Sequence, residues 1–211
     1  MTMRDSGDFP DAVAGCIVAL DRCDSLVSAV PLQAYGERPP GQASIGAHLR
    51  HSLDHFAAFL RGLPESVIDY DERARDTRLE CDPTVARGVI VATREAVAAL
   101  NESMLGKTLI VRQIAAPARP PVALHSTVAR ELVFLSQHTI HHLALMISVA
   151  CMLGLDLRPI SRWLSPPPRT AMTPRPAWNR HTIPGFGIAS RERRWPAGIR
   201  SRYTGGTRQG R

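Results

Sequence analysis

The chain contains little lysine, few aromatic residues and no long hydrophobic run. Of its 26 basic side chains only Lys107 is a lysine, and aromatic residues make up 5% of the 211 residues. The longest apolar run covers residues 143–155, which is shorter than the roughly 20 residues that a membrane-spanning helix requires. The N-terminus also lacks the basic start, apolar stretch and cleavage site of a secretory signal. We therefore expect a cytoplasmic protein with no membrane segment.

Cysteine motifs and common catalytic motifs are also missing. The four cysteines, Cys16, Cys23, Cys81 and Cys151, form no Cys-x-x-Cys pair. Free thiols in a reducing compartment are therefore expected rather than a disulfide framework. The sequence has no glycine-rich phosphate loop and no zinc-finger spacing, so functions that depend on those motifs are disfavoured.

The net charge of +7 is unevenly distributed along the chain. Residues 1–155 carry 14 basic and 17 acidic side chains, a net charge of −3, whereas residues 156–211 carry 12 basic and 2 acidic side chains, a net charge of +10. The basic character therefore belongs to the last quarter of the chain.

Apolar residues recur at helical spacing in four parts of the first 155 residues. The expected helices cover residues 13–30, 43–62, 82–100 and 126–154. Asp82 and Pro83 supply an N-cap and a proline at the first helical position. Ser126 is the expected N-cap of the last helix, and Gly154 suits a left-handed C-terminal cap.

Two connections between these helices are long. Residues 65–81 form a charged crossover, and residues 105–125 contain a possible short strand at 108–112 followed by a proline-rich stretch. Connections of this length are typical of a bundle with crossovers rather than of a simple up-and-down bundle. The sequence thus predicts an all-α fold for residues 1–155, a four-helix bundle with crossover connections.

Residues 156–211 differ sharply from the rest of the chain. They hold 8 of the 17 prolines and all three tryptophans, and apolar periodicity is lost. A segment of this composition buries little surface, so we expect it to be disordered. The preference for arginine over lysine indicates a G+C-rich coding sequence, in which an out-of-frame reading yields Arg, Pro, Gly and Trp. A genuine basic extension and a frameshift product therefore both stay open.

Six of the eight histidines lie in two expected helices, at helical spacing. They are His48, His51, His55, His138, His141 and His142. Side chains four residues apart project from the same side of a helix. Two such histidines and a third from a facing helix would form a three-nitrogen pocket for a divalent metal, with one coordination position left open.

The alternative is that each histidine is a core residue bonded to a neighbour. Five or six histidines on two apolar helix faces favour the metal site. His48 and His141 would then orient ligands or lie on the surface, and Asp54 and Glu131 are candidates to orient an imidazole. Both acids are also ordinary helix-surface residues. Three neutral imidazoles suit zinc first, with nickel, iron or manganese as alternatives.

The histidine segments resemble those of the DinB-like family of metalloenzymes, which includes bacterial thiol S-transferases. The resemblance rests on the segments 44–55, 130–132 and 138–142 and covers residues 10–154. It implies a four-helix bundle whose metal is held by His51, His138 and His142, with His55 as the alternative first ligand. The chain departs from the family after Leu153, where relatives continue with a segment containing glycine and proline.

Three functions stay open at this point. The resemblance implies a metal-dependent thiol transferase, or a detoxifying hydrolase on the same site, with a small thiol and an electrophile as substrates. The second is a non-catalytic metal-binding bundle that dimerises, and a homodimer is expected in either case. The third is non-specific nucleic-acid binding through the arginine-rich tail. The sequence specifies neither the thiol nor the metal.

Overall fold

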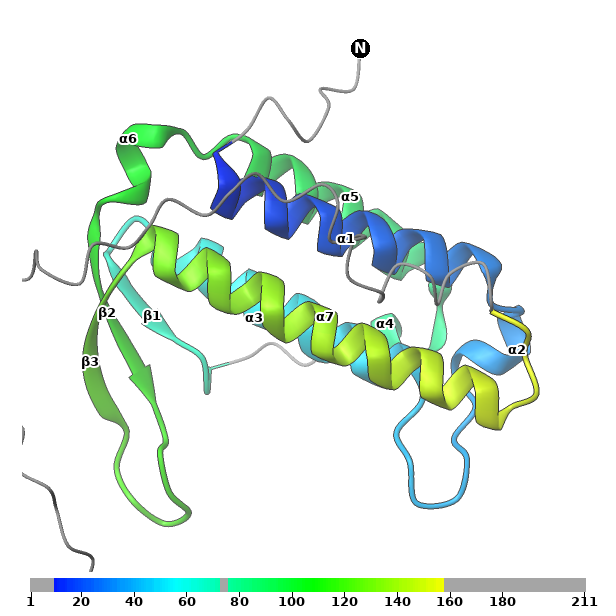
Figure 1. Cartoon of the computed structure of the whole chain (residues 1–211). Helices are drawn as coiled ribbons and strands as arrows, with labels where there is room; N and C mark the ends of the chain where they lie inside the picture. The colour runs from blue at the N-terminus through cyan, green and yellow to red at the C-terminus, as the bar shows by residue number, and fades with distance from the viewer. Residues whose placement is uncertain (1–9, 73–75, 158–211) are drawn as a thin grey trace, which may run out of the picture. The chain divides into compact units, whose positions relative to one another are not determined.

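The computed structural model describes residues 10–72 and 76–157, which contain four long helices and a small sheet (Figure 1). The long helices are α1 (Asp11–Ala29), α3 (Ile45–Gly62), α5 (Pro83–Ala98) and α7 (Val128–Met152). Three short helices, α2 (Leu32–Tyr35), α4 (Arg78–Cys81) and α6 (Glu102–Leu105), lie in the connections. The expectations for the basic tail lie outside the described residues, apart from Asp156 and Leu157.

The long helices form a four-membered bundle. Helix α1 packs against α5 and α7, and α3 packs against the same two helices. The connections from α1 to α3 and from α5 to α7 therefore join helices that lie diagonally opposite each other in the bundle. This arrangement confirms the predicted crossover connections.

Capping residues explain where three of the long helices begin. The Ser44 side chain accepts a hydrogen bond from the Ala47 amide at the start of α3. The predicted Asp82 cap of α5 accepts bonds from the amides of Thr84 and Val85. The prediction for α7 was wrong by one residue, because Thr127 caps it by accepting from the Arg130 amide.

The expectation of an all-α fold was incomplete, because the described residues also form a three-stranded sheet. The sheet lies at one end of the helix bundle (Figure 1). Its order is β1 (Val67–Asp69), β2 (Thr108–Gln113) and β3 (Val122–Thr127). Strand β1 pairs in parallel with β2, and β2 pairs antiparallel with β3. The predicted strand at residues 108–112 is thus β2. The sheet lies in the two long connections.

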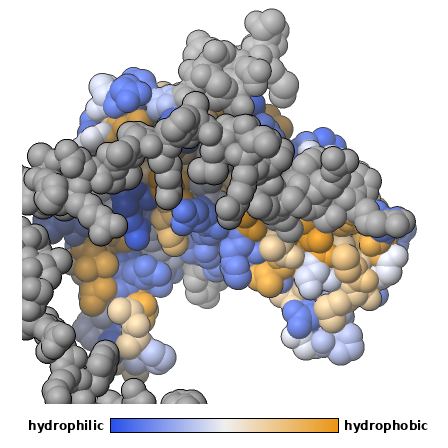
Figure 2. Space-filling view, in the orientation of Figure 1, coloured by the Kyte–Doolittle hydropathy of each residue, from blue (hydrophilic) through white to orange (hydrophobic). Residues whose placement is uncertain are grey.

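The β2–β3 hairpin carries exposed apolar side chains. Ile114, Val122 and Leu124 are exposed by 47%, 40% and 55%. Figure 2 shows hydrophobic residues gathered over this hairpin, at the left of the view. All four cysteines are free, as predicted, with Cys16 and Cys23 buried in the core and Cys81 and Cys151 exposed.

Helix α7 is the one described helix that is long and apolar enough to cross a membrane. Its composition has another explanation, because α7 packs against both α1 and α3 and places residues such as Leu135, Leu143 and Met146 in the core. A core helix of a bundle passes the same test of length and composition.

Two glycines of α3 allow other backbone segments to approach closely. A Cβ atom at Gly46 would lie 2.2 Å from the carbonyl oxygen of Glu80, and one at Gly62 would lie 2.3 Å from that of Val67. Helix α3 is therefore pressed against α4 at one end and against the start of β1 at the other. Glu80 is also paired with Arg38 at 2.8 Å and with Arg50 at 3.1 Å, which holds α4 against α3.

The contact at Gly46 predicts a large effect of a single methyl group. Gly46→Ala should lower the free energy of unfolding by about 1–3 kcal/mol, because overpacking forces the backbone of α4 away. Gly88→Ala is the matched control on α5, where an added Cβ meets nothing within 4 Å, and it should raise stability by about 0.5–1 kcal/mol. Urea unfolding of both variants measures the difference. Equal effects of the two substitutions would contradict the close packing.

Candidate metal centre

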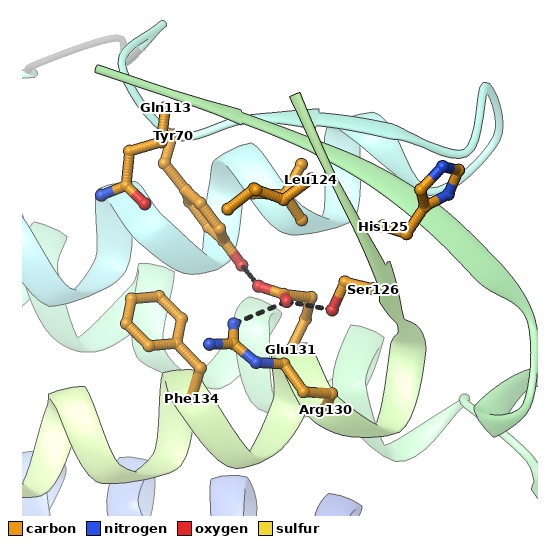
Figure 3. Close-up of a pocket in the computed structure, with 9 residues that line it drawn as sticks. Tyr70, Gln113, Leu124, His125, Ser126, Arg130, Glu131 and Phe134 are labelled. Carbon is orange, nitrogen blue, oxygen red and sulfur yellow. Dashed lines mark hydrogen bonds and ion pairs between the residues drawn. The ribbon is translucent and has the colours of Figure 1, made fainter. Parts of the chain in front are cut away.

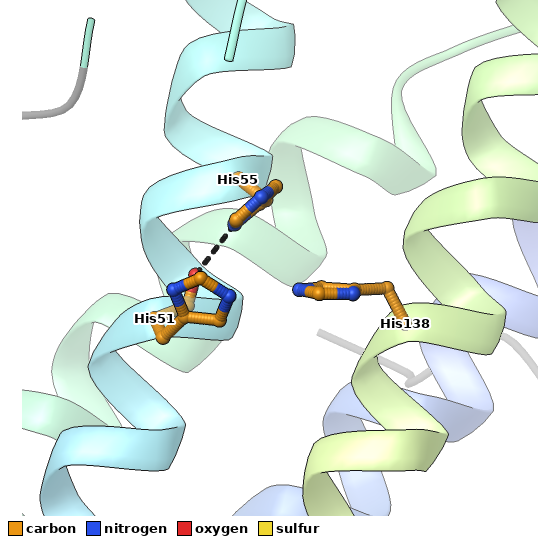
Figure 4. Close-up of side chains that lie close together, drawn as sticks. All are labelled: His51, His55 and His138. Atoms are coloured by element: carbon orange, nitrogen blue, oxygen red, sulfur yellow. Dashed lines mark hydrogen bonds between the residues drawn. The ribbon is translucent and has the colours of Figure 1, made fainter. Parts of the chain in front are cut away.

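The histidines of α3 and α7 face one another across the contact between these helices (Figure 4). The ligand nitrogens of His51, His55 and His138 all lie within 4.8 Å of one another. His142 is next to the same group, with its ring centroid 4.5 Å from that of His51 and 4.6 Å from that of His138. Helices α3 and α7 thus bring together four imidazoles, which we call the histidine cluster. Its members are His51, His55, His138 and His142.

The ring contacts also show how α3 and α7 run. His48 contacts His142, His51 contacts both His138 and His142, and His55 contacts His138. Residue numbers rise along α3 while they fall along α7, so the two helices are antiparallel. Histidines spaced by three or four residues on each helix can therefore meet in successive layers.

The donor set of the cluster fits a divalent metal. In a tetrahedral zinc site, bonds of about 2.0–2.1 Å place neighbouring nitrogens about 3.3 Å apart. The separations of up to 4.8 Å among His51, His55 and His138 are therefore within about 1.5 Å of those in such a site. Three histidines from two helices are placed to bind a metal, and the ligand type agrees with zinc, nickel, iron or manganese.

A backbone contact orients the ring of His55. Its Nδ1 lies 2.8 Å from the carbonyl oxygen of His51, one helical turn earlier. A carbonyl only accepts, so Nδ1 carries the proton and donates it. The Nε2 atom of His55 is then the nitrogen with a lone pair for an ion.

His142 is held by a different partner. Its Nδ1 lies 3.2 Å from Nδ1 of His48, so one of the two rings donates to the other. Burial, followed by the nearby His138, lowers the pKa of His142 to about 4. The pKa of His48 is also lowered, mainly by burial. Both rings are therefore neutral at pH 7, the state that metal binding requires.

The predicted ligand set and the closest observed group share two members. His51, His138 and His142 were predicted, whereas the tightest group contains His55 in place of His142. His142 nevertheless lies against both other rings. The predicted set therefore stays a prediction, with His55 and His142 as the two candidates for the third ligand.

The remaining candidates lie in different surroundings. His141 is exposed, with its ring 5.4 Å from that of His142. Asp54 is buried on α3 with 6% exposure. Glu131 is fully buried, and its hydrogen bonds go to Tyr70, Ser126 and Arg130 rather than to an imidazole. Glu131 is therefore linked to the cluster through Tyr70, which contacts His55, and through Arg130 and Phe134, which contacts His138.

Two aromatic residues that the sequence did not single out form a wall beside the cluster. The ring of Tyr70 stacks on His55 with centroids 5.5 Å apart, and the ring of Phe134 stacks on His138 at the same distance. Tyr70 and Phe134 also contact each other at 5.4 Å. One signal for Tyr70 was available in the sequence. It is an aromatic residue within a charged connection, in a chain that has few aromatic residues.

Glu131 fixes Tyr70 in this position. The Tyr70 hydroxyl donates to Glu131 Oε2 at 2.8 Å, and Arg130 Nη1 donates to Oε1 at 2.7 Å (Figure 3). The Ser126 hydroxyl also donates to Oε1, at 2.5 Å. Burial and the Glu131 carboxylate raise the pKa of Tyr70, so its hydroxyl stays protonated and keeps donating. This network joins β3, α7 and the residue after β1.

The fold and the cluster define a helical bundle whose candidate metal site lies between two of its helices. A family model of the DinB superfamily matches residues 18–146, a span that includes all the clustered histidines. The chain belongs to the DinB superfamily, as the sequence motifs indicated. No curated protein and no solved structure matches the chain.

The lowered pKa of His142 predicts a pH dependence of stability in the metal-free protein. In the unfolded chain this imidazole takes up a proton near its ordinary pKa of about 6.5, whereas in the folded protein it does so only at about 4. The free energy of unfolding should therefore fall as the pH drops from about 6.5 to about 4, and no change from this group is expected above that range.

His142→Asn should make that fall smaller, as measured by urea unfolding at several pH values. His125→Asn changes an exposed histidine of β3 and serves as the control. An unchanged pH profile in His142→Asn would contradict the assignment.

Proposed function

We propose that this protein is a metal-dependent enzyme that transfers a small thiol to an electrophile. The observation that supports the proposal is the convergence of imidazoles from α3 and α7. When bound, a divalent metal supplies a Lewis acid that favours the thiolate over the thiol at neutral pH. His51 and His138 would hold the ion, with His142 as the third ligand and His55 as the alternative.

The thiols buried in the core of the protein are unsuited to supply the sulfur, and we propose that it comes from the substrate. Burial raises the pKa of both Cys16 and Cys23 to about 12, so these core thiols are protonated and unreactive at neutral pH. In the transfer itself, the thiol sulfur forms a bond to the carbon of the electrophile and the leaving group departs with the bonding electrons. The thiol proton goes to solvent.

Metal analysis of the purified full-length protein tests the site. The wild-type chain should retain a divalent metal, and His51→Ala and His138→Ala should each lower the metal affinity by more than about 100-fold, because removing a ligand exceeds the effect of removing an outer partner. Comparison of His142→Ala with His55→Ala identifies the third ligand. His125→Ala is the control and should keep the metal. Full metal retention in both His51→Ala and His138→Ala would refute the site.

Turnover separates the enzyme from a non-catalytic metal-binding bundle. The metal-loaded protein should consume a small thiol in the presence of an aryl chloride, with release of chloride, and His51→Ala should abolish the reaction. A protein that holds the metal but turns over no combination in a panel of thiols and electrophiles is a binding protein instead. Hydrolysis of an ester or amide without a thiol would favour the hydrolase.

A further inference from the structure

A cavity of about 170 Å³ lies beside Tyr70 and Phe134, the two aromatic residues that border the histidine cluster, and Figure 3 shows residues that line it. Its lining includes Tyr70, Leu124, Ser126, Arg130, Glu131 and Phe134. An apolar cavity of about 150 Å³ holds a benzene molecule, so this one admits a group of about six non-hydrogen atoms. Tyr70 and Phe134 line the cavity and also stack on His55 and His138. The cavity and the candidate metal centre therefore share a wall.

The two charged residues of the lining are exposed to very different degrees. The side chain of Glu131 is fully buried, whereas that of Arg130 is 65% exposed. Both Glu131 oxygens already accept hydrogen bonds from Tyr70, Ser126 and Arg130. A ligand that enters the cavity therefore meets the guanidinium, not the carboxylate.

The guanidinium is held in position from two sides. Arg130 Nη1 donates to Glu131 Oε1 at 2.7 Å, and the Arg130 Cζ atom lies 5.6 Å from the centroid of the Phe134 ring. Among the described residues, the hydrogen bonds of the Arg130 side chain use Nη1 alone. The Nε and Nη2 groups form the side of the fork that matches a carboxylate in bidentate geometry.

We infer that this cavity is a subsite for the carboxylate of a small ligand. The carboxylate binds Nε and Nη2 of Arg130, and the short body of the ligand packs against Leu124 and Phe134. The inference that this ligand is the thiol substrate rests on the proposed function. The substrate class is then a thiol that carries a carboxylate.

Two probes of equal size that differ in charge test the subsite. Calorimetric titration of the full-length protein compares 3-mercaptopropionate with 3-mercaptopropanamide, at fixed ionic strength, in metal-free and metal-loaded forms. The carboxylate should bind at least about tenfold more tightly than the amide even without metal, because hydrogen bonds between charged groups are that much stronger. Equal affinity for the two probes in the metal-free protein would overturn the subsite.

Variants assign the preference to Arg130. In the double variant Arg130→Met with Glu131→Gln, the preference for the carboxylate probe should disappear. The second substitution is included because Arg130→Met alone would leave the buried Glu131 carboxylate without its ion-pair partner. Arg130→Lys keeps the charge but loses the fork, and should retain only part of the preference. Arg87→Met is the matched control, because Arg87 is also an exposed arginine paired with an acid, Asp24, at 2.7 Å. A preference that survives in the double variant would overturn the inference.

The outcome also separates this inference from the proposed function. A charge preference in the metal-free protein, together with failure of the chain to retain any metal, would leave the subsite standing and remove the metalloenzyme. Binding that requires metal and shows no preference for the carboxylate would do the reverse.

Discussion

The packing of α3 against α7 is the constraint on which the rest of the structure depends, because it places polar rings inside an apolar seam. Helix α7 carries buried residues such as Leu135, Leu143 and Met146 on the same element as His138 and His142. A buried polar group without a partner costs about 1–3 kcal/mol. Neighbouring imidazoles, the His51 carbonyl and the hydrogen bond between His48 and His142 provide partners within the seam. Three of these imidazoles, those of His51, His55 and His138, are also placed to bind an ion.

Around this seam the structure is arranged in layers. The histidine cluster is bordered by the rings of Tyr70 and Phe134, and the same rings line a cavity that also contains the guanidinium of Arg130. The sheet makes this possible, since β1 ends beside Tyr70 and β3 brings Ser126 to Glu131. The two long connections, before α5 and before α7, thus also supply residues that surround the candidate site.

Local signals in the sequence predicted the helices well and the sheet poorly. Apolar spacing and the Asp82-Pro83 cap located the helices because these signals act within a few residues. Strand β3 carries no such signal, since most of its residues are exposed and its order comes from pairing with β2. Spacing likewise put His51, His55, His138 and His142 on facing sides of two helices. It could not decide which of His51 and His55 is the ligand from α3, because that choice depends on ring orientations set by backbone and histidine contacts.

The histidine cluster draws on two helices that are far apart in the chain, and this affects when it can assemble during translation. About 90 residues separate His55 from His142, which corresponds to roughly 5–18 s at synthesis rates of about 5–20 residues per second. During this interval α3 presents its imidazoles without their counterparts from α7. A site that uses imidazoles from both helices therefore cannot assemble until α7 has left the ribosome.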